Sequence, residues 1–281
     1  MVDMSNTPII SEEVAPGVYF DMPENQYRSA VGVNKSYAWA LYNSSKVHMA
    51  YGASKGIPQA SADRGTAVHK AFLDKEDVVE SSNYKTRQSD NFKAEHAEAA
   101  SRGKILFPTN ELEAVEGMIH AVNSEPRFNN FLNLPSTRTE VSLFAWDHKR
   151  DMMLKGRADI LNIVEGKAGD LKTCTSAKPE NFQETCAQFG YFPQAGMYMY
   201  ICKLLGIEIT KFGFFCVENK APHVCHINYL TTKCEAYEYA MDMTEKMLDA
   251  AADDVHSEKL ETGWGNSTLL QLPPSLKFKK S

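Results

Sequence analysis

The sequence predicts an α/β protein in which a central mixed β-sheet is flanked by helices. Two groups of strand-like segments, at about 137–173 and 209–229, are separated and flanked by segments with the apolar spacing of helices. With 281 residues, 43% of them hydrophobic, the chain can bury one substantial core. We therefore expect a single domain over 1–281, without internal repeats or low-complexity segments.

The first half of the chain is expected to be mainly helical. Residues 1–22 read as a loosely ordered lead, and 23–135 as the helical part. Apolar residues recur there at helical spacing, which predicts helices over 35–45, 61–80, about 91–102 and about 110–124.

The second half, 136–260, carries the predicted sheet and ends in a tail over 261–281. Period-two patterning predicts strands over 139–146, 153–164, 168–173, 209–217 and 224–229. Pro179 begins a long predicted helix that runs to about Leu205 and is ended by Gly206. A last helix is predicted over 231–258. The order is therefore helix, three strands, helix, two strands and helix.

Composition excludes several classes of protein. No apolar run is long enough for a membrane span, and the N-terminus lacks the pattern of a secretory signal. The six cysteines form no Cys-x-x-Cys pair and no zinc spacing, so they read as reduced core thiols. None precedes residue 174, which disfavours an iron–sulfur cluster that uses cysteines on both sides of the core.

Three ionisable residues stand out on two adjacent predicted strands. Asp170 and Lys172 are two apart, so on a strand their side chains point to the same face. Asp159 lies on the preceding strand, and the polar, glycine-bearing turn over 165–169 can bring it beside Asp170. Neighbouring carboxylates repel each other unless a cation lies between them, and oxygen ligands suit Mg²⁺ or Mn²⁺. With a lysine beside the metal, this set is the minimum for metal-assisted phosphodiester hydrolysis. The alternative is a structural ion pair between one acid and Lys172.

The spacing Asp-x(10)-Asp-Leu-Lys resembles the motif of the PD-(D/E)XK nuclease superfamily. Two further segments resemble RecE-type exonucleases, the group of exonuclease VIII and its phage relatives: Asp63-Arg64-Gly65-Thr66-Ala67-Val68-His69 and Tyr191-Phe192-Pro193-Gln194-Ala195-Gly196-Met197-Tyr198. Segments near both ends resemble the same family: Tyr27 with Val33-Asn34-Lys35-Ser36, and Gly263-Trp264-Gly265 with Leu272-Pro273-Pro274. The resemblance covers about residues 20–275. One departure is that the second acid is Asp, where many superfamily members have Glu.

The resemblance implies a restriction-endonuclease-like core, which matches the predicted order of elements, and it implies a role for each matching residue. Asp159, Asp170, His69 and the carbonyl of Leu171 would bind metal, and Lys172 would orient or deprotonate the attacking water. We expect Mg²⁺ as the cofactor, with Mn²⁺ as an acceptable substitute.

Glu140, Gln194 and Tyr198 are weaker candidates, each with a plain structural alternative. Glu140, on the first core strand, is either a further acid at the site or an edge-strand charge. Gln194 and Tyr198 are four apart on one helix face. Gln194 could orient Lys172, the water or a phosphate. Tyr198 could contact DNA or support the site, but ordinary helix–sheet packing suits it better.

The net charge of −6 means that a DNA-processing chain must concentrate its positive charge in a channel. The candidates are Arg64, Lys104, Lys155, Arg157 and Lys178, each of which could equally be a solvated surface charge. Among these, Arg64, Arg157 and Lys178 are the predicted DNA-binding residues.

The family resemblance also implies an activity and partners. RecE-type enzymes degrade the 5′ strand of linear double-stranded DNA, leave a 3′ overhang and form closed rings, here expected as a trimer or tetramer. They act with a RecT-like single-strand annealing protein, so we expect the cytoplasm of a bacterial cell or a phage-infected host and no membrane. The alternatives are a PD-(D/E)XK endonuclease, a Cas4-like end-processing nuclease, a catalytically silent nucleic-acid-binding module and a non-nuclease metalloenzyme.

Overall fold

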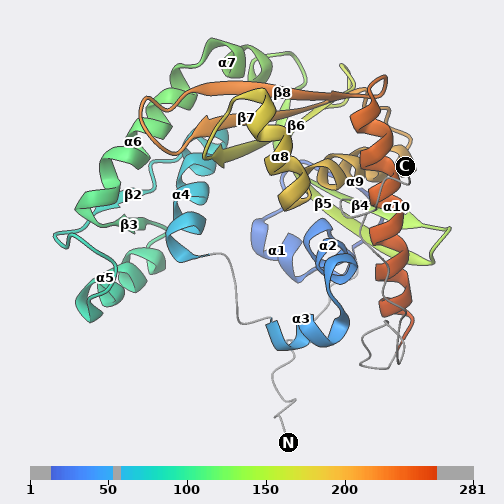
Figure 1. Ribbon diagram of the computed structural model, residues 1–281, viewed down its shortest axis with the longest axis horizontal. Coiled ribbons are helices and arrows are strands. Elements are labelled where there is room, and N and C mark those ends of the chain that lie inside the picture. Colours follow the sequence, from blue (N-terminus) through green and yellow to red (C-terminus); the bar gives the residue numbers. More distant parts are fainter. Residues whose placement is uncertain (1–13, 53–57, 258–281) are drawn as a thin grey trace, which may run out of the picture.

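The protein is built around a six-stranded mixed β-sheet (Figure 1). The structure is a computed structural model that describes residues 14–52 and 58–257. The strands, in spatial order, are β1 (Gly17–Tyr19), β4 (Arg138–Asp147), β5 (Met152–Asn162), β6 (Lys167–Cys174), β7 (Lys211–Glu218) and β8 (Cys225–Thr231). The pair β6–β7 is parallel and the other neighbours are antiparallel. The predicted fold class, an α/β core with a mixed central sheet, is thus confirmed.

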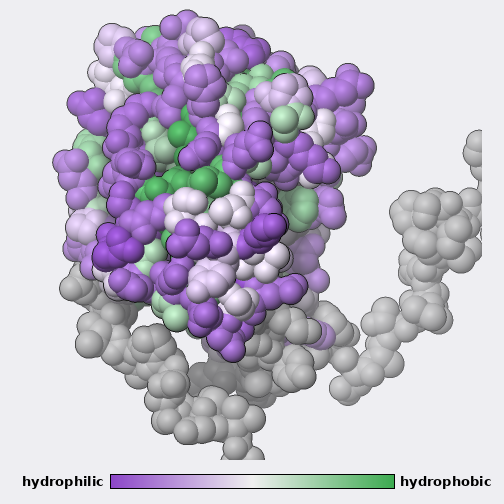
Figure 2. All heavy atoms as spheres, turned by 90° about the vertical axis from the view of Figure 1, so that its left-hand side faces the viewer, coloured by the Kyte–Doolittle hydropathy of each residue, from purple (hydrophilic) through white to green (hydrophobic). Residues whose placement is uncertain are grey.

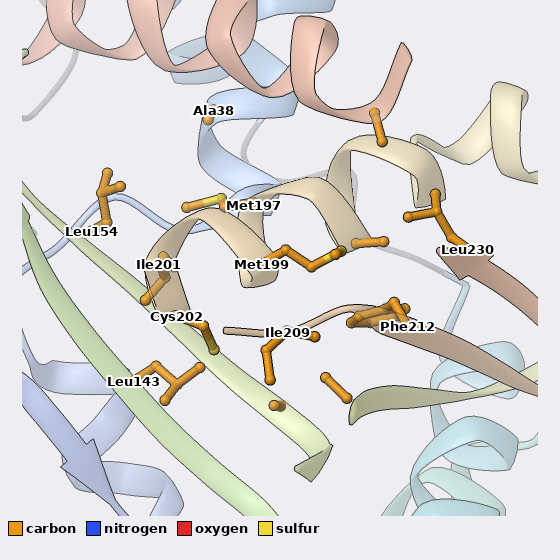
Figure 3. Close-up of a cluster of buried hydrophobic side chains, with 14 of the residues drawn as sticks. Ala38, Leu143, Leu154, Met197, Met199, Ile201, Cys202, Ile209, Phe212 and Leu230 are labelled. Atoms are coloured by element: carbon orange, nitrogen blue, oxygen red, sulfur yellow. The ribbon is translucent and has the colours of Figure 1, made fainter. Parts of the chain in front are cut away.

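One face of the sheet is covered by four helices. These are α2 (Lys35–Asn43), α8 (Pro179–Phe189), α9 (Tyr191–Leu204) and α10 (Glu235–Val255). Helix α9 lies directly on β4 and β5, and α10 packs on α9 and α2. Figure 3 shows Met197, Met199 and Ile201 of α9 among the side chains of this core, together with Leu143 and Phe212 from the sheet.

The opposite face is covered by α4 (Gln59–His69), a π-helical turn η1 (Lys70–Asp74), α6 (Thr109–Ser124) and α7 (Pro126–Leu132). Their apolar side chains form a second core with Ile160, Leu171 and Phe215 of the sheet. Because residues alternate between faces along a strand, Leu171 points to this core while Asp170 and Lys172 point to the α9 side.

A smaller unit extends beyond α4 and α6. It holds α5 (Asp90–Ser101) and the parallel two-stranded sheet of β2 (Val79–Ser81) and β3 (Ile105–Phe107). Figure 2 shows that the face on this side of the molecule is mostly hydrophilic, with apolar side chains gathered near its middle. The remaining short helices, α1 (Glu24–Ser29) and α3 (Lys46–Gly52), lie near α2 in the chain. Within the described residues, no helix is long and apolar enough to cross a membrane.

Three sequence predictions need correction. The long helix from Pro179 to Leu205 is two helices, because Gly190 adopts the left-handed backbone conformation (φ +66°) between α8 and α9. The helix predicted over 61–80 is shorter: α4 and η1 together end at Asp74, and residues 79–81 form strand β2. The predicted lead over 1–22 contains a strand, because residues 17–19 pair with β4. A segment of three residues is too short for its sequence pattern to reveal a pairing with a distant strand.

Candidate active site

Three carboxylates lie in a row across three neighbouring strands. In the β4–β5 register Thr139 pairs with Ile160 and Val141 with Ala158, which places Glu140 opposite Asp159. In the β5–β6 register Ile160 pairs with Gly169, so the next step places Asp159 opposite Asp170. The hairpin therefore brings the two aspartates together as the turn over 165–169 predicted, and β4 adds a third acid.

Glu140 occupies a break in the β4 ladder. Its backbone has φ +52°, a conformation that non-glycine residues rarely adopt and that concentrates at functional sites. The carboxylate accepts a hydrogen bond from Nε of Arg157 at 2.7 Å. Arg157 also donates to the hydroxyl of Ser142 and to the carbonyl of Met22, so the pair is held in a fixed position.

The two aspartates are buried and share a set of hydrogen bonds. Asp159 is 9% exposed and accepts from the backbone N–H of Leu171 at 2.7 Å. Asp170 is 3% exposed; one of its oxygens accepts from the amide of Gln194, and the other lies 2.6 Å from Nζ of Lys172. Burial, and then the charge of Asp170, raise the pKa of Asp159 to about 7. The site therefore resists holding both negative charges unless a cation is added.

Lys172 is surrounded by groups that keep it protonated. Burial is the largest single effect on its amine and by itself would lower the pKa. The charges of Asp170, Tyr191 and Asp159 together outweigh burial, so the pKa lies above its ordinary value. Its Nζ also lies 4.6 Å from the centre of the Tyr191 ring. In this arrangement Lys172 is a hydrogen-bond donor and a positive charge, not a free base.

His69 reaches the acids from the opposite layer. It is the last residue of α4, and its Nε2 lies 2.8 Å from the carbonyl oxygen of Leu171 while its Nδ1 lies 3.4 Å from Asp159. His69, Glu140 and Asp159 each offer one possible metal-ligand atom, and these three atoms lie within 4.8 Å of one another. Among residues 14–52 and 58–257, no other group of three His, Cys, Asp or Glu residues meets this condition.

This donor set fits a hard divalent cation. Carboxylate and carbonyl oxygens with one imidazole are the ligands that Mg²⁺ accepts and Mn²⁺ favours, and the raised pKa of Asp159 reflects charge that such an ion would neutralise. The residues that could hold it are His69, Glu140, Asp159 and Asp170, with the carbonyl of Leu171.

Glu140 and Asp159 line a groove of about 980 Å³ whose walls carry several cations. Two of the predicted cations, Lys155 and Arg157, line it, but both already have partners. Lys155 donates to the carbonyls of Tyr27, Arg28 and Ala30, and thereby holds the end of α1.

Arg64, Lys104 and Lys178 are not among the described residues that line this groove. Arg64 contacts Ser61 on its own helix, and the Lys104 amine donates to the carbonyl of Asp77. Lys178 is exposed at the start of α8 and pairs with Glu180.

Gln194 and Tyr198 both face the sheet from α9, as their spacing predicted. Gln194 is 8% exposed and binds Asp170. The Tyr198 hydroxyl donates to the carbonyl of Arg157 at 2.8 Å, and its ring packs on Gly156, where an added Cβ would come within 2.7 Å of it. Tyr198 thus packs on β5 next to the acids, as expected from the alternative of ordinary helix–sheet packing. Trp264 and the C-terminal segments of the resemblance lie outside the described residues.

Sequence reasoning missed a network that anchors α4. Asp63 is buried and accepts from Arg87, His96 and Gln59, while Arg87 also pairs with Glu111. Asp63 is the first residue of the segment that ends in His69. An acidic residue within that motif was therefore the sequence feature that could have indicated this network. Lys35 was also missed as a groove residue, although its segment carried part of the resemblance.

Known proteins provide three comparisons. Residues 44–262 match the family described as "PDDEXK-like domain of unknown function" (DUF3799). Among solved structures, a "putative exonuclease" from Eubacterium rectale is similar over 90% of this chain and 96% of its own, with a TM-score of 0.59 and 14% identity. A phage-related exonuclease from Haemophilus somnus covers 68% of this chain and 94% of its own at 12% identity, but its TM-score of 0.32 supports no argument. At these identities the likeness establishes the fold alone, and no curated protein matches the sequence.

Proposed function

This chain belongs to the PDDEXK-like family of DUF3799, and from that premise we propose that it is a divalent-metal-dependent exodeoxyribonuclease. It would resect linear double-stranded DNA from the 5′ end, releasing 5′-mononucleotides and leaving a 3′ overhang for annealing-type recombination. The observation that carries a nuclease function is the row Glu140–Asp159–Asp170 across three strands. Two of these acids, Glu140 and Asp159, line one groove together with Lys172 and His69. The direction of degradation is supported by the resemblance to RecE-type exonucleases.

The proposed cofactor is Mg²⁺, which Mn²⁺ could replace. His69, Glu140, Asp159, Asp170 and the Leu171 carbonyl would hold it. A bound divalent ion would lower the pKa of a water molecule and neutralise charge on the phosphoryl oxygens.

The protein groups have separate tasks in this proposal. Lys172, protonated and fixed between Asp170 and Tyr191, donates a hydrogen bond to the attacking water or to a phosphoryl oxygen. Gln194 fixes one oxygen of Asp170, and Arg157 fixes Glu140. Attack of water in line on phosphorus breaks the bond to the 3′ oxygen of the upstream sugar, leaving a 5′-phosphate and a 3′-hydroxyl.

The proposal extends to assembly and setting. A ring-shaped trimer or tetramer, threaded by DNA and acting with a RecT-like annealing protein in a bacterial or phage-infected cytoplasm, follows from the same resemblance. The net charge of −6, together with cations such as Lys35 and Arg157 on the groove walls, is consistent with an acidic exterior around a DNA path.

The decisive test is digestion of linear duplex DNA labelled at either the 5′ or the 3′ end, beside a closed circular plasmid, with Mg²⁺ or with EDTA. We expect early release of 5′-labelled mononucleotide that requires Mg²⁺, is lost in Lys172→Ala and spares the circle. Lys167→Ala, at the other end of β6 and paired with Glu165, is the matched control and should retain activity. Cleavage of the circle would indicate an endonuclease, and inactivity with both Mg²⁺ and Mn²⁺ would refute the proposal.

A further inference from the structure

Two pairs of stacked aromatic side chains, joined through Gly190, lead from Lys172 to the exposed Tyr42 of α2. These side chains, which we call the aromatic strip, are Tyr191, Phe189, Trp39 and Tyr42. The Tyr191 ring lies under Nζ of Lys172 and stacks on Phe189, with ring centres 6.0 Å apart. Trp39 in turn stacks on Tyr42 with ring centres 6.1 Å apart.

Gly190 joins the two halves of the strip. An added Cβ on Gly190 would come within 2.5 Å of the Trp39 indole, so the backbone between α8 and α9 lies directly on that ring. The left-handed turn at Gly190 therefore does more than separate two helices. It places Phe189 and Tyr191, which line the groove, on either side in sequence of the glycine that lies on the Trp39 ring.

The strip is open to solvent at two of its members. Phe189 is 52% exposed and Tyr42 is 39% exposed, so neither ring is needed to fill the core. Large aromatic rings left exposed beside a functional groove are typical of binding surfaces.

A cation lies within the strip. The Lys35 amine is 5.6 Å from the centre of the Trp39 ring and donates to the carbonyl oxygen of Phe189 at 2.9 Å. Within the part of the chain that the structure describes, it forms no ion pair with a carboxylate. Lys35 also lines the groove. Burial, and then the charge of Lys172, lower the pKa of Lys35 to about 8, and an approaching phosphate would favour its charged form.

We propose that the aromatic strip binds successive unpaired bases of a DNA single strand next to the active site, with Lys35 contacting its phosphate backbone. The inference rests on the proposed function, which it deepens by naming the part of the substrate that is held. Aromatic rings interleaved with a cation suit single strands, because unpaired bases of any sequence can stack on them. Bases inside a duplex are already stacked and paired, so the strip would favour a frayed or resected end. Its continuity with the groove favours nucleic acid over a protein partner as the occupant.

The test uses Trp39 as a reporter. In a Trp146→Phe, Trp264→Phe background Trp39 is the sole tryptophan, because the chain has three. Titration with a short oligothymidylate in EDTA, where no cleavage is expected, should quench its fluorescence. Phe189→Ala and Tyr42→Ala should each weaken binding by roughly five-fold or more, the range for loss of one stacked base. Lys35→Gln should weaken binding and reduce its dependence on salt.

Controls separate the strip from general effects. Tyr229→Ala removes an equally exposed ring on β8 and should bind like the wild type. A blunt duplex of the same length should quench Trp39 less than the single strand. Unchanged binding in both Phe189→Ala and Tyr42→Ala would overturn the inference, even with nuclease activity intact. So would a change in oligomer mass, measured by light scattering, without a change in DNA binding, because the strip would then be a subunit interface. Strip-dependent binding without cleavage under any metal would instead refute the proposed function alone.

Discussion

Removing one buried acid should stabilise the metal-free protein while abolishing its activity. The raised pKa of Asp159, about 7 against an ordinary 3.8, means that the fold disfavours its ionised form. Between those two pH values the folded state binds more protons than the unfolded state, so stability falls as pH rises. The full pKa difference corresponds to about 4 kcal/mol in the free energy of unfolding. Because Asp159 titrates together with Asp170, we expect the wild type to lose roughly 2–4 kcal/mol of stability between these pH values.

We therefore expect Asp159→Asn to be more stable than the wild type at pH 8 in EDTA, and to lose that advantage near pH 4. Urea unfolding at pH 4, 6 and 8 measures the free energy of unfolding and its slope for both proteins. Mg²⁺ should stabilise the wild type at pH 8 and have little effect on the variant. Asp242→Asn, at an exposed acid of α10, is the control and should follow the wild type.

A lower stability of Asp159→Asn than of the wild type at pH 8 without metal would refute this prediction. That result would mean that the hydrogen bond from Leu171 N–H outweighs the burial of the charge. A pH-independent difference between the two proteins would equally contradict it, because the predicted effect comes from titration of this carboxyl group.

Three further variants test other parts of the structure. Gln194→Ala should raise the Mg²⁺ concentration for half-maximal cleavage by roughly 10- to 100-fold, since Asp170 loses the amide that orients it; an unchanged metal titration would contradict this role. Gly190→Ala should lower the free energy of unfolding by roughly 1–3 kcal/mol, because its positive φ and the Trp39 contact both oppose a Cβ; wild-type stability in urea would be the contrary result. Arg150→Met should destabilise by roughly 3–5 kcal/mol, since it leaves the buried Asp147 without its cation, and the exposed variant Lys149→Met is its control; equal melting of the two would argue against a buried ion-pair network.

Several features could be predicted from the sequence because they depend on local periodicity. The helices α2, α5 and α6 lie within two residues of their predicted bounds, and five of the six strands of the central sheet were identified. Asp159, Asp170 and Lys172 were found together because a short hairpin converts their spacing into proximity. Their catalytic roles stay predictions until the cleavage assays are done.

Other features depend on contacts between distant segments. Glu140 joins the acid row because a break in β4 aligns it with Asp159, and no pattern in β4 alone requires that. Lys155 lines the groove, as expected of a channel cation, but its amine is bound to the carbonyls at the end of α1.

The aromatic strip shows the same division. The sequence by itself determined which residues are aromatic, where the strands and most helices lie, and that two acids and a lysine share one hairpin. Only the tertiary structure decided that Gly190 would meet Trp39 and that α4 would bring His69 to Leu171. The physical reason is that local patterns reflect the geometry of one segment, whereas these contacts form only when helices from both halves of the chain pack on the same sheet.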